Sequence, residues 1–165
     1  MIGVVSAALL TSAGAVNATP TKNTIYVDGT KVNGAAYMIN NNNYFKLRDV
    51  AAMVNGQFEV SWNETNKRID LTTNKAYTVV GGEMALPSSA VKTAKESKAS
   101  VFKDGNKADY TGYNISDNNY YKLRDLCKDM NIGVKFDLAT NRVDILTTVG
   151  YGEEDNAGNT TKPTT

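Results

Sequence analysis

The sequence contains no histidine and only one cysteine, Cys127. Structural zinc sites take roughly four Cys or His ligands, and the Ser–His and Cys–His arrangements of nucleophilic catalysis need a histidine base. Neither can be built here, and a disulfide within the chain is excluded as well. We therefore expect a protein that is not an enzyme, with no catalytic residues, no metal and no cofactor, and we interpret Cys127 as a buried, unreactive thiol.

An excess of charge of one sign is also missing, since 18 basic residues face 17 acidic ones and leave a formal net charge of +1. Proteins that bind the phosphate backbone of DNA or RNA usually carry a basic excess. We therefore expect no nucleic-acid partner. The length of 165 residues leaves room for one medium domain or two small ones.

Hydrophobic runs of membrane-spanning length are absent, and the main apolar stretch lies at the N-terminus. Residues 1–18 carry no charge and end in Val16-Asn17-Ala18, which fits the pattern that signal peptidase cuts ahead of Thr19. No Lys or Arg precedes this stretch, as expected if a basic upstream segment is missing from the start. The stretch is too short for the roughly 18 apolar residues of a membrane span. The pattern predicts a secreted protein with no membrane span in the mature chain.

Two near-copies of one stretch organise the rest of the chain. Residues 43–49 read Asn-Tyr-Phe-Lys-Leu-Arg-Asp, and residues 119–125 read Asn-Tyr-Tyr-Lys-Leu-Arg-Asp. The same shift of 76 residues aligns Asp28-Gly29 with Asp104-Gly105, and a shift of 74 aligns Asp70 with Asp144 further on. Chance similarity would not keep its order over so many positions, so the sequence predicts a duplication.

Each copy begins with the signals of short antiparallel strands. In the first copy a strand-like run at 25–27 is followed by Asp-Gly, a favoured hairpin turn. A second extended run covers 31–39 and ends in the asparagines at 40–42, which tolerate the left-handed backbone of turns. A third run covers 44–46. The second copy repeats this order.

The apolar period then changes from two to 3.6, which predicts one helix per copy with Leu47 or Leu123 on its buried face. Alternation resumes after the helix and predicts two more strands. Trp62 and Phe136 share a face with neighbouring apolar residues, so we expect both in the core. Each copy thus reads β-β-β-α-β-β, and the expected fold class is α+β, with two small antiparallel meander sheets that each carry one helix on the apolar face.

A unit of about fifty residues is marginal alone, so we expect the two copies to pack together or to exchange strands. The segment between them is predicted to be mostly exposed, with a helical turn or two at 90–97. The polar C-terminal tail has little to bury and is expected to be disordered. The expected organisation is a signal peptide at 1–18, a first repeat at 24–77, a linker at 78–99, a second repeat at 100–148 and a tail at 149–165.

The run from 25 to 77 resembles the copper amine oxidase N-terminal-like domain, also called the stalk domain, of secreted proteins from Gram-positive bacteria. The resemblance rests on the Tyr-Phe-Lys-Leu-Arg-Asp string at 44–49, on Tyr26-Val27-Asp28-Gly29 and on Phe58-Glu59-Val60-Ser61-Trp62, and it covers nearly all of the mature chain as two tandem copies. It implies a meander sheet with a packed helix in an extracellular, cell-wall setting. It implies no copper, because amine oxidase catalysis belongs to a separate domain with three histidines. The Asn-Tyr pairs here also lack the acidic residue that follows in the cofactor-forming motif.

Charged residues that recur in both copies are predicted to be structural. Asp49 and Asp125 stand just inside their helix starts, where a carboxylate interacts favourably with exposed amide groups and the helix dipole. Adjacent helix residues point about 100° apart, so Arg48 and Arg124 are not expected to pair with these acids. We expect them to form ion pairs with Asp70 and Asp144 on the last strands.

Recurring tyrosines offer the one candidate ligand contact. Tyrosines beside asparagines could stack on a sugar ring while the amides bind its hydroxyls, and packing in the core or at its rim is the competing interpretation. The four residues are Tyr37, Tyr44, Tyr113 and Tyr120. The asparagines at 40–43 and Asp117-Asn118 lack EF-hand spacing and fit turns better than a calcium site.

The expected function is that of a secreted, non-catalytic structural, adhesion or assembly module of the cell envelope. The alternative is an accessory module that binds cell-wall polysaccharide. Partners compatible with these interpretations are a wall polysaccharide, an envelope protein or a second copy of the chain. Glycosidase chemistry that uses only Asp and Glu is the one enzymatic class that the composition leaves open.

Overall fold

The computed structural model describes residues 15–156 of the chain. The apolar core of the predicted signal peptide and most of the predicted polar tail lie outside these residues. The elements of the described part are β1 Ala15–Pro20, β2 Thr24–Val27, β3 Thr30–Val32, β4 Ala36–Ile39, β5 Asn42–Lys46, α1 Leu47–Met53, β6 Phe58–Asn63, β7 Arg68–Thr73, β8 Lys92–Glu96, β9 Ser100–Lys103, β10 Asn106–Ala108, β11 Gly112–Ile115, β12 Asn118–Lys122, α2 Leu123–Met130, β13 Gly133–Asp137, β14 Arg142–Leu146 and the 3₁₀ turn η1 Glu154–Asn156.

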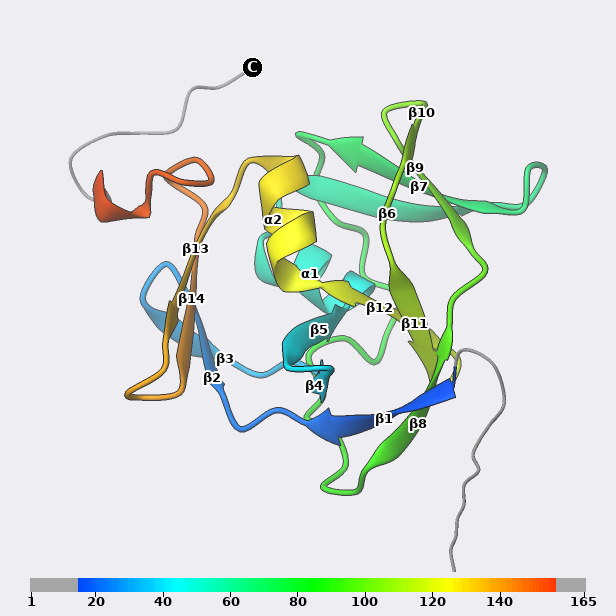
Figure 1. The fold of residues 1–165 in the computed structure, drawn as a ribbon. Helices are drawn as coiled ribbons and strands as arrows, with labels where there is room; N and C mark the ends of the chain where they lie inside the picture. The colour runs from blue at the N-terminus through cyan, green and yellow to red at the C-terminus, as the bar shows by residue number, and fades with distance from the viewer. Residues whose placement is uncertain (1–14, 157–165) are drawn as a thin grey trace, which may run out of the picture.

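Three sheets surround the two helices. A closed barrel has the strand order β1-β4-β5-β12-β11-β8, and two outer sheets have the orders β10-β9-β7-β6 and β13-β14-β2-β3. Figure 1 places the helices at the centre, one outer sheet on each side and the barrel below them. The predicted α+β class is confirmed, but two separate meander sheets do not form.

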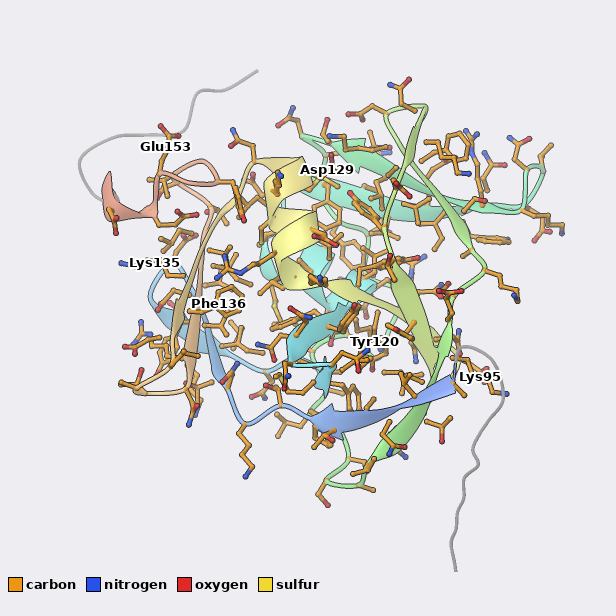
Figure 2. The ribbon with its side chains drawn as sticks, in the orientation of Figure 1. Lys95, Tyr120, Asp129, Lys135, Phe136 and Glu153 are labelled. Carbon is orange, nitrogen blue, oxygen red and sulfur yellow. The ribbon has the colours of Figure 1, made fainter. Side chains whose placement is uncertain are left out.

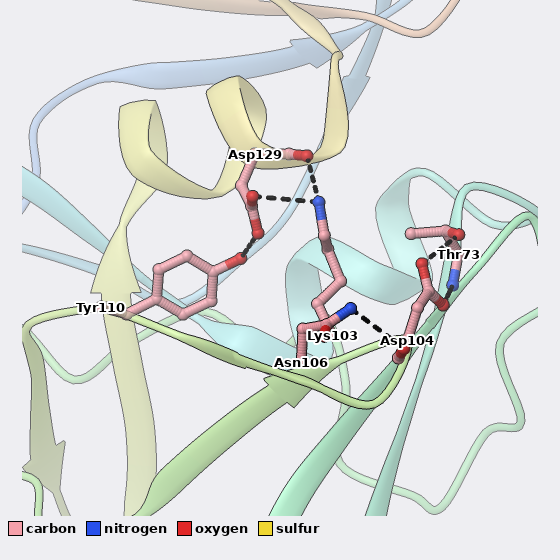
Figure 3. Close-up of polar contacts among 6 residues, drawn as sticks. All are labelled: Thr73, Lys103, Asp104, Asn106, Tyr110 and Asp129. Atoms are coloured by element: carbon pink, nitrogen blue, oxygen red, sulfur yellow. Dashed lines mark hydrogen bonds and ion pairs between the residues drawn. The ribbon is translucent and has the colours of Figure 1, made fainter.

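The two copies exchange strands. The β2–β3 hairpin of the first copy pairs in parallel with β14 of the second, and β9 of the second copy pairs in parallel with β7 of the first. The aspartates of the Asp-Gly hairpin turns form hydrogen bonds to the other copy and so stabilise this exchange. Asp104 accepts hydrogen bonds from the amide and hydroxyl of Thr73 at 3.0 and 2.7 Å, as Figure 3 shows, and Asp28 binds Thr147 in the same way. The copies therefore form one interlocked body.

The predicted helices form, and their leucines are buried. Leu47 is 3% exposed and Leu123 is 0% exposed. Both belong to the main core, which the helices share with the inner faces of the outer sheets. The Asp-Gly turns also form as predicted, with φ of 48° and 85° at Asp28 and Gly29, the positive pair that a tight hairpin turn requires.

Trp62 and Phe136, which were expected in the core, are not fully buried, and neither is Leu138. Trp62 is 49% exposed, Leu138 is 89% exposed and Phe136 is half-buried. The helix is too short to cover the strand ends, because the seven residues of α1 span about 10 Å. The six residues of β6 reach about 20 Å. The last residues of the hairpins therefore project beyond the core.

The segment expected as a linker at 78–99 contains a barrel strand. Lys92–Glu96 forms β8, not the helical turn expected there, and pairs with β1 on one side and β11 on the other. Strand β1 in turn contains residues 15–18 of the predicted signal peptide, and Ala18 and Ala94 are both 0% exposed inside the barrel. Strands β1 and β8 thus both lie outside the ranges predicted for the two repeats.

Part of the predicted tail is also ordered. Val149 is 1% exposed and accepts a hydrogen bond from the amide of Gly133 at 3.0 Å. Glu154 accepts the amide hydrogen of Val134 at 3.0 Å. Residues 149–156 therefore cover the edge strand β13. Within residues 15–156 we find no helix with the length and apolar character needed to cross a bilayer.

Candidate functional site

The four recurring tyrosines lie together inside the barrel. Tyr37 packs edge-on against Tyr120 with ring centroids 5.5 Å apart, and Tyr44 packs in the same way against Tyr113 at 5.2 Å. Tyr37, Tyr44 and Tyr120 are 4 to 6% exposed, and burial raises the pKa of each hydroxyl. Only Tyr113 is half-buried. Their rings form the barrel core, so three of the four have no face on which a sugar could stack.

The predicted ion pairs between helix arginines and strand aspartates do not form. Asp70 pairs with Arg68 two residues away at 2.8 Å, and Asp144 pairs with Arg142 at 2.7 Å. Strand neighbours at i and i+2 lie on the same face, which brings these groups together without crossing the sheet. Arg48 instead donates to the carbonyl of Val60 at 3.3 Å and to the hydroxyl of Tyr77.

The two helix aspartates differ although their positions are equivalent. Asp49 is 0% exposed and accepts the amide hydrogens of Ala35 and Met84 at 2.8 and 2.9 Å. Its carboxylate therefore joins the helix to two segments outside it, instead of binding its own helix end. Asp125 is half-buried and receives no such bonds within the described residues.

Cys127 is 1% exposed on the buried face of α2, as predicted. Desolvation raises the pKa of its thiol to about 12, so the nucleophilic thiolate is scarce at neutral pH. Among residues 15–156, no group of three or more His, Cys, Asp or Glu side chains could hold a metal ion.

A groove of about 540 Å³, here named the large groove, opens where the barrel meets the outer sheet of the second copy. Its walls come from the connection after β1, the asparagine turn between β4 and β5, the start of α2 and the tip of the β13–β14 hairpin. Figure 2 shows Phe136 on β13, to the side of the barrel that contains Tyr120. The lining residues are Thr19, Pro20, Thr21, Lys22, Asn23, Met38, Asn41, Asn42, Asn43, Lys122, Arg124, Phe136, Asp137, Leu138, Asn141 and Arg142.

The large groove combines an apolar side with many amides. Leu138 and the partly exposed ring of Phe136 provide the apolar surface, and the guanidinium of Arg124 lies 4.2 Å from the centre of that ring. Asn41 and Asn42 are exposed on the opposite turn, where Asn41 has the positive φ of 67° that the predicted turn requires. The groove can therefore hold a ligand that offers both apolar faces and hydrogen-bonding groups.

The first copy has an equivalent but smaller groove of about 150 Å³, here named the small groove. Lys46, Arg48 and Trp62 line it where Lys122, Arg124 and Phe136 line the large groove, and Asp117 stands in place of Asn41. A cation of the small groove is already bound within the chain, because Lys46 donates a hydrogen bond to the carbonyl of Gly82 in the segment after β7.

Sequence reasoning singled out the asparagine runs of both grooves, but it interpreted them as turns. It placed Trp62 and Phe136 in the core and gave no ligand-binding role to Lys22, Lys122 or Leu138. A signal for the groove was present, since the β13–β14 tip carries an apolar Leu138 at a turn where polar residues are usual.

In comparisons with known proteins, no protein-family profile, no curated protein and no solved structure matches this chain.

Proposed function

We propose that the protein is a secreted, non-catalytic adhesion module that holds a cell-envelope polysaccharide in its large groove. The observation that carries the proposal is the composition of that groove. Exposed Asn41 and Asn42 line this groove together with the apolar side chains of Phe136 and Leu138. Sugars present hydroxyls at their edges and apolar C–H faces, which matches this arrangement. The groove volume of about 540 Å³ lies within the ~300–1,000 Å³ of small-ligand sites.

A binding role fits the acidic groups of the groove better than catalysis does. Glycoside hydrolysis generally uses two carboxylates about 5–9.5 Å apart. Among residues 15–156, Asp137 is the one acidic residue that lines the large groove. The large groove therefore offers half of the pair that the reaction needs.

Cosedimentation with insoluble glycans tests the proposal. Leu138→Ser combined with Asn42→Ala removes one contact from each wall, and both side chains are exposed, so the fold should not change. Leu86→Ser is the matched control, because Leu86 is 71% exposed and lies outside the groove. We expect binding by the native protein and the control, and loss of binding in the double variant. Absence of binding to every wall preparation and glycan would contradict the proposal.

The tyrosines are unsuitable for this test. Tyr44→Ala and Tyr120→Ala would remove buried rings from the barrel core, and large-to-small core changes cost about 3–5 kcal/mol for an aromatic side chain. Loss of binding would then report unfolding. The resemblance of the chain to stalk domains remains a prediction, and it agrees with an adhesion role.

A second candidate function is that of a spacer or assembly unit without a small ligand, and the exchanged hairpins favour it. Both parallel junctions join the copies, so the body cannot extend by separating them. Strands β6 and β10 form the edges of one outer sheet, and exposed edges can pair with another chain. Concentration-dependent mass in analytical ultracentrifugation, without glycan binding, would favour this candidate.

Export is part of the proposal, and β1 constrains where the signal peptide would be cut. Cleavage ahead of Thr19 would remove Ala15 to Ala18, which pair with β8 and close the barrel. Ala13-Gly14-Ala15 offers the same small-residue pattern further upstream. We therefore expect the N-terminus of the secreted protein at or before Val16. N-terminal sequencing that finds Thr19 in a folded secreted protein would contradict this expectation.

A further inference from the structure

The large groove carries an excess of positive charge. Lys22, Lys122, Arg124 and Arg142 line it, and Asp137 is the acid among its lining residues. The chain as a whole has a net charge of only +1. The positive charge is therefore gathered at this groove and is balanced elsewhere on the molecule.

Two of these four cations have internal partners. Arg142 forms an ion pair with Asp144 at 2.7 Å, and Arg124 lies over the ring of Phe136. Lys22 and Lys122 form no ion pair within residues 15–156. Lys22 is exposed on the connection after β1, and Lys122 is half-buried at the start of α2. Two walls of the groove thus each present one ammonium group that is available to a ligand.

The small groove uses the equivalent cations differently. Lys46, the counterpart of Lys122, donates to the carbonyl of Gly82. Arg48, the counterpart of Arg124, donates to a carbonyl and to a tyrosine hydroxyl. Asp117 adds a negative charge at the position of Asn41. Of these two grooves, the large one alone combines lysines that form no ion pair within residues 15–156 with a volume in the range of small-ligand sites.

From this contrast we propose that the ligand of the large groove is an acidic polysaccharide, one whose sugars carry carboxylate groups. This inference rests on the proposed function and specifies its ligand class. Lys22 and Lys122 contact carboxylates on successive sugars, while Asn41 and Asn42 bind hydroxyls and Leu138 packs against a ring face. The ammonium groups are point charges in a groove that is open to solvent, so their attraction is screened by salt.

A polysaccharide fits the groove better than a nucleic acid or an acidic peptide. Single-stranded nucleic acids bind through bases stacked on open aromatic rings, and the ring of Phe136 already carries Arg124 on one face. An acidic peptide needs backbone partners or an apolar pocket for its side chains. The lining includes five asparagines and two threonines, whose amides and hydroxyls suit a ligand rich in hydroxyl groups.

The test compares soluble polygalacturonate with neutral dextran by isothermal titration calorimetry or affinity electrophoresis. Polygalacturonate should bind, and binding should weaken when salt rises from about 0.01 to about 0.15 M, which shortens the Debye length from about 30 to about 8 Å. Lys22→Gln with Lys122→Gln should weaken binding about tenfold if each exposed contact contributes the usual few tenths to 1 kcal/mol. Lys31→Gln with Lys75→Gln removes the same charge from outside the grooves and should leave binding unchanged.

Each other outcome has a defined meaning. Equal binding of dextran and polygalacturonate, insensitive to salt and to the Lys22/Lys122 change, would overturn this inference and leave the adhesion proposal standing. No binding of either polymer or of any other glycan would overturn both. Tighter binding of an oligonucleotide or a poly-glutamate peptide than of polygalacturonate, with the same lysine dependence, would overturn the assignment to a polysaccharide.

Discussion

The duplicated chain contains its own control for the stabilising effect of a buried carboxylate. Asp49 and Asp125 occupy equivalent positions in the first turn of their helices. Asp49 is 0% exposed, and its two oxygens accept the amides of Ala35 and Met84 at 2.8 and 2.9 Å. A comparison of Asp49→Ala with Asp125→Ala therefore separates the stabilisation by these two hydrogen bonds from the stabilisation that any carboxylate provides at the start of a helix.

The expected difference follows from the partners that are left behind. Asp49→Ala leaves the buried amide of Ala35 without an acceptor, which costs about 1–3 kcal/mol. The amide of Met84 is only partly buried and can bind water instead, so the loss of its hydrogen bond to Asp49 costs less. The total destabilisation by Asp49→Ala is therefore about 2–4 kcal/mol. Asp125→Ala removes mainly a dipole interaction at a partly exposed site, worth about 0.3–1 kcal/mol.

Urea unfolding followed by circular dichroism measures both costs. With a slope of about 2 kcal/mol per M, Asp49→Ala should lower the midpoint by about 1–2 M and Asp125→Ala by less than about 0.5 M. Asp49→Asn keeps one acceptor and should fall between them. Equal midpoints for the two alanine variants would refute the assignment of a stabilising role to the Ala35 and Met84 bonds.

Four further predictions concern individual side chains. Gly112→Ala should destabilise the protein by about 1–3 kcal/mol in urea unfolding, because a Cβ there would lie 2.3 Å from the ring of Tyr121. Tyr121→Phe should leave the unfolding midpoint unchanged or raise it, since this buried hydroxyl lies near Ser97 but makes no hydrogen bond of normal geometry among the described residues. Desolvation opposes ionisation of Glu83, but bonds from the Tyr77 hydroxyl and backbone amides lower its pKa from 4.5 to about 2. The contribution of ionised Glu83 to the free energy of unfolding should be complete above pH 4.5 and should be lost as the pH falls from 4.5 to about 2. Glu83→Gln should reduce this pH dependence of stability in acid titrations. Cys127 should react with a thiol reagent at pH 8 only after denaturant is added, because burial raises its pKa to about 12.

Local conformation could be predicted from the sequence where it depends on nearby residues. The Asp-Gly turns need two positive φ values, and they form at Asp28-Gly29 as predicted. The change of period at Leu47 correctly located the start of α1. These features depend on backbone sterics and on side-chain spacing within a few residues, so the pattern is enough to place them.

The choice of partner strands could not be predicted in this way. A strand has the same alternation whether it pairs within its own copy or with the other, and β2 pairs with β14 across more than a hundred residues of sequence. Strands β1 and β8 gave an even weaker signal, because each completely buries a single alanine, Ala18 or Ala94, between residues that are exposed or half-buried. The equal spacing of these alanines by 76 residues was the available clue.

The candidate site was missed because its residues lie where the core ends. Alternation correctly predicted the face of the strand from which Trp62 and Phe136 project, but burial also depends on whether another element covers that face. The two helices have only seven and eight residues and span about 10–12 Å, which is shorter than the strands of the hairpins. A groove thus forms between parts that are distant in sequence, from Lys22 to Arg142. Sequence periodicity contains no information about that gap.

The two halves have diverged in pairs of contacting residues, which explains how one framework can carry two different grooves. Gly34 lies under the methyl group of Met53 in the first copy, and a Cβ on this glycine would lie 2.1 Å from that methyl carbon. The same two positions hold Tyr110 and Asp129 in the second copy. Their side chains hydrogen-bond to each other, and Asp129 also accepts from Lys103 (Figure 3).

The barrel shows the same compensation, because Ala36 faces Phe45 in one copy and the smaller Gly112 faces the larger Tyr121 in the other. In both cases the two positions changed together while the backbone arrangement was kept. Once the framework is held by such compensated pairs, residues at the hairpin tips are free to change alone. The interlocked core therefore allows the large groove to keep free lysines while the small groove uses its cations internally.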